Sequence, residues 1–196
     1  LAAARRRAPA SLNAGALKGF FLPPGEAGIL HIDNPRVWWS WDLGKPELYT
    51  LAVCVEEGGK VSDTEKTTFG IRKIESRLTE DGYRQMMLNG KDVLIKGAGW
   101  TDDIFLRDTP ESIERQVRYV MDMNMNLIRF ENIWGKDDTV YDLCDRLGVM
   151  ALVGFSCQWE WEDYCGLPEY KGYGCINGKE VEDLAFAYFR DQVTRL

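Results

Sequence analysis

The last hundred residues repeat one pattern three times: a short apolar run, a cluster of polar and aromatic side chains, and an amphipathic helix. The apolar runs are Val93–Gly99, Leu127–Phe130 and Val149–Phe155. Strands that alternate with helices in this way are typical of parallel βαβ units with right-handed connections. The pattern therefore restricts the second half of the chain to an α/β fold around a parallel sheet.

The helices that follow these runs are marked by capping residues and apolar stripes. Thr109 followed by Pro110 predicts a helix start, since a threonine hydroxyl caps a helix and proline is tolerated in its first turn. Asp137 or Asp138 predicts the second start, and Gly148 predicts its end. The stripes comprise Ile113, Val117, Val120 and Met121; Val140, Leu143, Cys144 and Leu147; and Val181, Leu184, Ala185, Tyr188, Phe189 and Val193.

Residues 1–78 have the composition of β-strands. Leu48–Val55 and Thr67–Ile74 flank a glycine-containing turn and predict an antiparallel pair at the end of a β-sandwich. Arg84–Leu88 and Asp92–Lys96 predict a second hairpin, because the Asn-Gly pair between them tolerates the positive φ of a tight turn. Three tryptophans of the first half are predicted to pack between the two halves: Trp38, Trp39 and Trp41.

Charge and cysteine content exclude several classes of function. The net charge of −7 argues against a nucleic-acid partner, which would favour a basic stripe. No apolar stretch is long enough to cross a bilayer, and no signal peptide is visible at a start that lacks Met, so the targeting cannot be read. The five cysteines fit no zinc template and are expected to be buried free thiols. A Cys165–Cys175 bridge is the alternative in a secreted protein.

The polar clusters after the three runs hold the candidate ligand-binding side chains, because such groups gather at the C-terminal ends of strands in a βα barrel. Carboxylates, an arginine and indoles together suggest a pocket for a polar ring such as a sugar. For the indoles the alternative is core packing, and for the first two aspartates it is helix capping. The long segment Cys157–Lys179 favours a functional loop. The cluster residues are Trp100, Asp102, Asp103, Arg129, Glu131, Asn132, Trp134, Cys157, Trp159, Glu160, Trp161 and Glu162.

Four motifs follow one another in order along Asn34–Leu196. They are the paired tryptophans and Pro-x-Leu-Tyr run of Asn34–Leu51, Phe69–Arg72, Leu88–Gly90 with Lys96 and Gly97, and Asn126–Arg129. Together they resemble glycoside hydrolase family 2, although Ser40 stands where that family usually has proline. Further motifs resemble the exo-β-glucosaminidase branch: Asp103, Phe105, Leu106 and Arg107; Arg129, Phe130 and Glu131; and Trp161 with Glu162. Ser156 departs from the pattern, since a glutamate would be expected near there.

The resemblance implies a multi-domain fold: residues 1–78 as the C-terminal part of an immunoglobulin-like β-sandwich, and residues 79–196 as the N-terminal part of a TIM (β/α)8 barrel. It implies a retaining glycosidase of terminal β-linked sugars, with no cofactor or metal. Its catalytic carboxylates are expected beyond Leu196, so the chain alone is expected to be inactive. The implied partners are a carbohydrate substrate and the remainder of the parent chain, and an extracellular or periplasmic parent would fit.

The resemblance also implies roles for individual residues. The substrate-binding residues would be Trp100, Asp103, Arg129, Glu131, Trp134, Trp161 and Glu162. Glu131 would bind the ammonium of a glucosamine unit, and its alternative is an ion pair with Arg129. Arg129 would orient a catalytic carboxylate, or else form a structural ion pair. Two rival functions are a β-mannosidase or β-galactosidase of the same family, and a non-catalytic carbohydrate-binding or scaffolding module.

Overall fold

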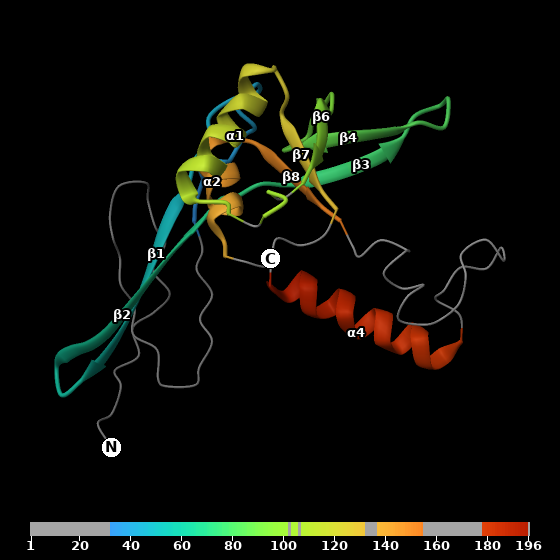
Figure 1. The fold of residues 1–196 in the computed structure, drawn as a ribbon. Coiled ribbons are helices and arrows are strands. Elements are labelled where there is room, and N and C mark those ends of the chain that lie inside the picture. Colours follow the sequence, from blue (N-terminus) through green and yellow to red (C-terminus); the bar gives the residue numbers. More distant parts are fainter. Residues whose placement is uncertain (1–31, 102, 106, 132–136, 155–177, 196) are drawn as a thin grey trace.

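The computed structural model describes residues 32–101, 103–105, 107–131, 137–154 and 178–195. These residues form eight strands and three helices (Figure 1). In chain order they are β1 (Tyr49–Glu57), β2 (Lys60–Phe69), β3 (Ile74–Leu78), β4 (Arg84–Leu88), β5 (Lys91–Val93), β6 (Gly97–Trp100), α1 (Pro110–Asp122), β7 (Leu127–Phe130), α2 (Thr139–Leu147), β8 (Met150–Val153) and α4 (Lys179–Arg195).

The first hairpin, β1–β2, extends away from the other elements (Figure 1) and pairs Tyr49 with Phe69 at its base. The predicted antiparallel pair is confirmed, but its second strand ends at Phe69 rather than at Ile74. The chain leaves the hairpin because it contacts Trp38 instead. The backbone N–H of Trp38 donates to the carbonyl of Ile71 at 2.8 Å. A Cβ at Gly70 would lie 3.1 Å from the Cβ of Trp38, so glycine permits this approach.

The second hairpin belongs to a three-stranded antiparallel sheet in the order β3-β4-β5. Asn89 and Gly90 form its predicted tight turn, with φ of 50° and 80°. The returning strand ends at Val93, which is earlier than the predicted Lys96. The residues that follow do not continue the ladder, because the carbonyl of Leu94 and the N–H of Lys96 both bond to the side chain of Asn126.

The second half contains the predicted parallel sheet, in the order β6-β7-β8. The predicted run Leu127–Phe130 is confirmed as β7, whereas the first strand begins at Gly97 instead of Val93. Helices α1 and α2 cover one face of this sheet (Figure 1). The core on that face contains Trp100, Ile113, Val117, Ile128, Phe130, Val140, Leu143, Cys144 and Val149.

The tryptophans of the first half pack against the second half, as predicted. The indole Nε1–H of Trp38 donates to the carbonyl of Asp145 in α2 at 2.7 Å. The indole Nε1–H of Trp41 donates to the carbonyl of Met125 at 2.9 Å. Gly148 ends α2 in the left-handed conformation, and its carbonyl accepts the backbone N–H of Trp41 at 2.9 Å. The segment before β1 is therefore bonded to the end of α2 and to the turn before β7.

The predicted third helix is confirmed as α4, although most of its apolar stripe is exposed and Ala185 is its buried member. The cysteine expectation holds for Cys144, which is buried, and fails for Cys54, which lies on the exposed hairpin strand β1. Cys157, Cys165 and Cys175, with the proposed bridge, lie outside the described residues.

The start of α1 is held by a reciprocal pair of side-chain hydrogen bonds. The hydroxyl of Thr109 accepts the backbone N–H of Ser112 at 3.2 Å, and the hydroxyl of Ser112 accepts the backbone N–H of Thr109 at 2.9 Å. Thr109→Ala removes one half of this cap and is expected to lower the free energy of unfolding by about 1 kcal/mol. Urea denaturation followed by circular dichroism would measure it. Thr109→Ser should keep the cap, and an equal loss in both variants would contradict this role.

Candidate functional site

Arg129 lies on the face of the parallel sheet opposite α1 and α2. Its neighbours on β7, Ile128 and Phe130, point into the helix-covered core, so alternation directs Arg129 away from it. In register, Arg129 stands between Gly99 of β6 and Leu152 of β8, and all three are exposed. A Cβ on Gly99 would meet nothing within 4 Å. The guanidinium therefore lies on an open sheet face where a ligand can reach it.

Glu131 directly follows β7 and is exposed. Among the described residues no ion pair joins it to Arg129. An exposed carboxylate and a guanidinium at the C-terminal end of one strand provide acceptors and donors for a polar ligand. That these two side chains bind a sugar stays a prediction.

Gly154 holds the backbone of Glu131 close to the end of β8. The N–H of Gly154 donates to the carbonyl of Phe130 at 3.0 Å. A Cβ at Gly154 would lie 2.4 Å from the carbonyl oxygen of Glu131 and 2.6 Å from that of Phe130. Such approaches are not possible for a larger residue without a backbone shift. Gly154 thus lets the backbone of Glu131 lie against the end of β8, and this contact positions the Cα of Glu131.

Asp103 organises the turn that follows β6. Its Oδ1 accepts the backbone N–H groups of Phe105 at 2.9 Å and of Arg107 at 3.3 Å. The backbone N–H of Asp103 donates to Oδ2 of Asp108 at 3.0 Å, and Asp108 also accepts from Gln116 of α1 at 3.3 Å. One oxygen of Asp103 is therefore engaged in holding the turn, whereas the helix cap of α1 is Thr109.

The other predicted binding residues divide into one core residue and three that the structure does not describe. Trp100 packs in the core against Phe130, with ring centroids 6.0 Å apart, and its Nε1–H is buried without a hydrogen-bond partner. Its position agrees with the core alternative. Trp134, Trp161 and Glu162 lie outside the described residues, as do Asp102, Asn132, Ser156, Cys157, Trp159 and Glu160.

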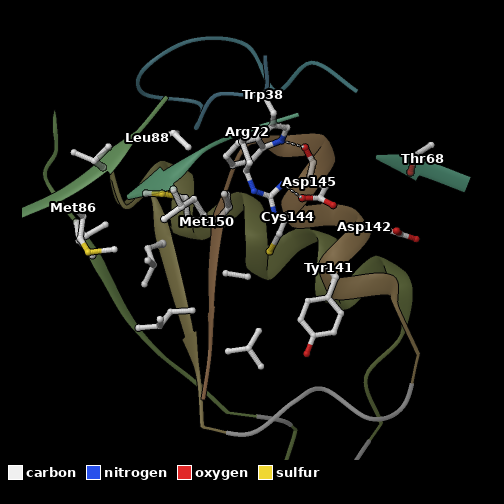
Figure 2. A pocket seen from close by; sticks show the side chains of 18 of the residues that line it. Trp38, Thr68, Arg72, Met86, Leu88, Tyr141, Asp142, Cys144, Asp145 and Met150 are labelled. Carbon is white, nitrogen blue, oxygen red and sulfur yellow. Dashed lines mark hydrogen bonds and ion pairs between the residues drawn. The ribbon is translucent and has the colours of Figure 1, made fainter. Parts of the chain in front are cut away.

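A cavity of about 470 Å³ lies elsewhere, between β4, β8 and α2 (Figure 2). Met86, Leu88 and Met150 form its apolar side. Arg72 lies beside its polar side, with its guanidinium 4.9 Å from the centre of the Trp38 ring and 3.3 Å from Oδ1 of Asp145. None of the predicted sugar-binding residues lines this cavity.

The ionisable groups along α2 do not form a nucleophilic centre. Burial, together with the nearby Asp145 charge, raises the pKa of the Cys144 thiol to about 12. The thiol therefore stays protonated at neutral pH and cannot act as a thiolate. Burial also raises the pKa of Asp145, and the Arg72 guanidinium opposes that rise. This pair is a contact between the two halves of the chain.

The described part of the chain holds neither a metal cluster nor a membrane-spanning helix. No group of three or more His, Cys, Asp and Glu side chains there could hold a metal ion. Within the same residues, no helix has the length and apolar character needed to span a membrane.

Three residues that shape this site were not predicted as such from the sequence. Gly154 lies in the predicted apolar run Val149–Phe155. Its close contact with the backbone of Glu131 cannot be recognised from the neighbouring residues in the sequence. Asp108 is buried, although its place before the Thr109-Pro110 helix start is a recognisable capping context. Asn126 was read as a motif residue, and its bonds to Lys96, Leu94 and Asp42 depend on contacts far apart in sequence.

Comparison of the sequence with known proteins identifies a family and several relatives. The model of the family described as glycosyl hydrolases family 2 matches residues 8–72. The sequence is 38% identical to an exo-β-D-glucosaminidase of Streptomyces avermitilis, over 80% of this chain and 17% of that protein. It is 40% identical to an exo-β-D-glucosaminidase of Arthroderma benhamiae, over 74% of this chain and 17% of the relative.

A solved structure gives the same result. The exo-chitosanase CsxA of Amycolatopsis orientalis aligns with a TM-score of 0.62 and 34% identity, over 73% of this chain and 16% of that one. The same enzyme, an exo-β-D-glucosaminidase, has been solved with a glucosamine-configured castanospermine as inhibitor. The chain thus spans about a sixth of the length of these relatives. The chain belongs to glycoside hydrolase family 2, in its exo-β-D-glucosaminidase-like branch.

Proposed function

We propose that this chain is part of a retaining exo-β-D-glucosaminidase and supplies part of its substrate-binding surface. The observation that carries the proposal is the pair of exposed charged side chains, Arg129 and Glu131, at the C-terminal end of β7 on the open face of the sheet. Ligand-binding groups gather at this end of the strands in parallel βα folds. The named activity of the relatives at 34–40% identity supports the same substrate class.

The proposal includes the fold of the parent. Residues 79–196 would be the first part of a TIM barrel, and residues 1–78 the end of an immunoglobulin-like domain. The parallel register of β6, β7 and β8, with α1 and α2 packed on the same face, supports the first assignment. The open face that carries Arg129 would then be the inner face of the barrel.

Each charged side chain has a role in this proposal. Glu131 would accept hydrogen bonds from the ammonium group of a terminal glucosamine, and such charge-assisted bonds are stronger than neutral ones. Arg129 would lie beside a catalytic carboxylate of the parent and hold the pKa of that carboxyl low, since an adjacent cation favours the charged form. Retaining hydrolysis needs two carboxyl groups about 5–5.5 Å apart, one as nucleophile and one as acid and base.

Glu131→Gln in the full-length glycosidase tests the amine contact. We expect kcat/KM for an aryl β-glucosaminide to fall about 10- to 150-fold, since a hydrogen bond to a charged group contributes about 1.5–3 kcal/mol. Values for N-acetylated and neutral analogues should change little. Glu114→Gln is the matched control, at a half-buried position of α1 where Glu114 pairs with Arg118. An equal fall for charged and neutral substrates would show that Glu131 does not recognise the amine.

A further inference from the structure

Asn126 is fully buried at the turn just before β7, three residues ahead of Arg129. Its side-chain Oδ1 accepts the backbone N–H of Lys96 at 2.9 Å. Its Nδ2 group donates to the carbonyl of Leu94 at 3.0 Å and to Oδ2 of Asp42 at 2.8 Å. One side chain therefore joins the approach to β6, the start of β7, and the segment that precedes β1.

Asp42 is the charged member of this cluster. The hydroxyl of Ser40, which is fully buried, donates to Oδ1 of Asp42 at 2.7 Å. The Lys96 ammonium lies 3.3 Å from Oδ2 of Asp42 and 5.9 Å from the centre of the Trp41 ring. Ser40, at the position where relatives were expected to have proline, thus supplies a hydrogen bond that proline cannot make.

The carboxylate of Asp42 stays ionised at neutral pH. Burial acts to raise its pKa, but the bonds from Ser40, Asn126 and Lys96, with the Lys96 charge, outweigh burial and lower the pKa. An aspartate with a lowered pKa stabilises the fold above its ordinary pKa, and that contribution is lost as the pH falls through the lowered value. Lys96 is the ionisable group that faces Asp42 among the described residues.

We propose that Asn126 is a positioning residue for Arg129, and that Asp42 fixes the orientation of the Asn126 amide. An ionised carboxylate only accepts hydrogen bonds, so Asn126 must present its NH2 group to Asp42. The side-chain oxygen of Asn126 then accepts the backbone N–H of Lys96, the residue directly before β6. This inference rests on the proposed function, because it gives Arg129 a substrate-facing task.

The consequence for Arg129 follows from the pairing of the strands. Gly97 pairs with Leu127 and Gly99 with Arg129, directly after the residues that Asn126 holds. A slip of one residue would turn Arg129 from the open face to the core face, because side chains alternate along a strand. The Asn126 side chain resists such a slip because it bonds Lys96 and Leu94 to the residue that directly precedes β7.

Three variants test the proposal. Asn126→Asp places a second carboxylate against Asp42 and removes the donors. Asp42→Asn is milder, because an asparagine both donates and accepts and so no longer dictates the orientation of the Asn126 amide. The exchange D42N/N126D restores one amide and one carboxylate in reversed positions. Asn124→Asp, an exposed substitution near Lys96, is the matched control.

The first measurement is hydrogen exchange in the 196-residue chain. We expect the Lys96 and Leu127 amides to exchange faster in the Asn126→Asp variant and to regain protection in the D42N/N126D variant, with α1 amides unchanged.

The second measurement is kcat and KM of the full-length glycosidase for an aryl β-glucosaminide across pH. For Asn126→Asp, kcat should fall about 10- to 100-fold at neutral pH, as small misplacements near a reaction centre do. It should partly recover at acid pH, where the two carboxyls share a proton.

Several outcomes would overturn the proposal. One is unchanged protection at Lys96 and Leu127 in both single variants. Others are a loss of kcat that is equal in the single and exchanged variants, or a loss independent of pH, since either would indicate general destabilisation. If Asn126→Asp does not fold, Asp42→Asn and the exchanged pair decide by the same criteria. A wild-type parent that hydrolyses no aryl glycoside would contradict the proposed function. The hydrogen-exchange measurement would still test whether the Asn126 side chain holds β6 and β7 in register.

Discussion

Replacing Trp38 by alanine is expected to lower the free energy of unfolding by about 3–5 kcal/mol, which is a large part of the stability of a small protein. Trp38 is 2% exposed and packs with Leu88 and Val93. Its indole also donates to the carbonyl of Asp145, and the Arg72 guanidinium stacks on its ring. Alanine removes all three contacts and leaves a cavity between the two halves of the chain.

Urea denaturation followed by circular dichroism would measure this loss, and Trp38→Phe is its control. Phenylalanine keeps an aromatic ring in the core but cannot donate to Asp145, so its cost should be about 1–3 kcal/mol, the range for an unsatisfied buried group. An alanine variant no less stable than the phenylalanine variant would mean that the ring does not fill a core position.

Gly148→Ala is expected to have the second largest effect, about 2–5 kcal/mol, because two penalties coincide there. Gly148 has φ of 79°, where a side chain costs about 1–2 kcal/mol. A Cβ at Gly148 would also lie 2.8 Å from the backbone nitrogen of Trp41, and overpacking of this kind costs about 1–3 kcal/mol. The new methyl group would push the Trp41 segment away from the end of α2.

Gly90→Ala separates the two penalties. Gly90 has φ of 80°, nearly the same as Gly148, but a Cβ there would meet nothing within 4 Å. The same denaturation measurement should therefore give only the conformational penalty for Gly90→Ala. Equal losses in the two variants would show that the contact between Gly148 and Trp41 contributes nothing to stability.

Features set by neighbouring residues could be predicted from the sequence. Thr109 and Pro110 mark the start of α1, Gly148 marks the end of α2, and Asn89-Gly90 marks a hairpin turn, because each depends on the backbone preference of its own residues. The alternation of strands and helices likewise predicted the parallel sheet, since each unit is local in sequence.

Features set by distant partners could not be predicted. β2 ends at Phe69 because the chain binds Trp38, and β6 begins only at Gly97 because Asn126 holds the residues before it. Trp100 was read as a sugar-binding side chain, yet it faces the core. Strand β6 reads Gly-Ala-Gly-Trp, so it has no alternation of polar and apolar residues that would indicate which face Trp100 takes.

The candidate site divides in the same way. Arg129 and Glu131 could be found because polar residues that directly follow an apolar run are visible in sequence. The supporting residues could not, because Gly154 acts through a backbone contact with Glu131 and Asp108 through the turn that Asp103 forms. Their roles depend on how strands and turns meet in space.

The bond from Trp38 to Asp145 has a consequence for the order in which the chain acquires its structure during synthesis. The two residues are 107 positions apart, so the indole lacks its hydrogen-bond acceptor until α2 has been made. At the usual rates of translation this takes about 5–20 s, during which the Nε1–H of Trp38 has no native acceptor. Chaperones that recognise exposed aromatic side chains would meet the nascent chain in this interval, and a pause in translation before Asp145 would prolong it.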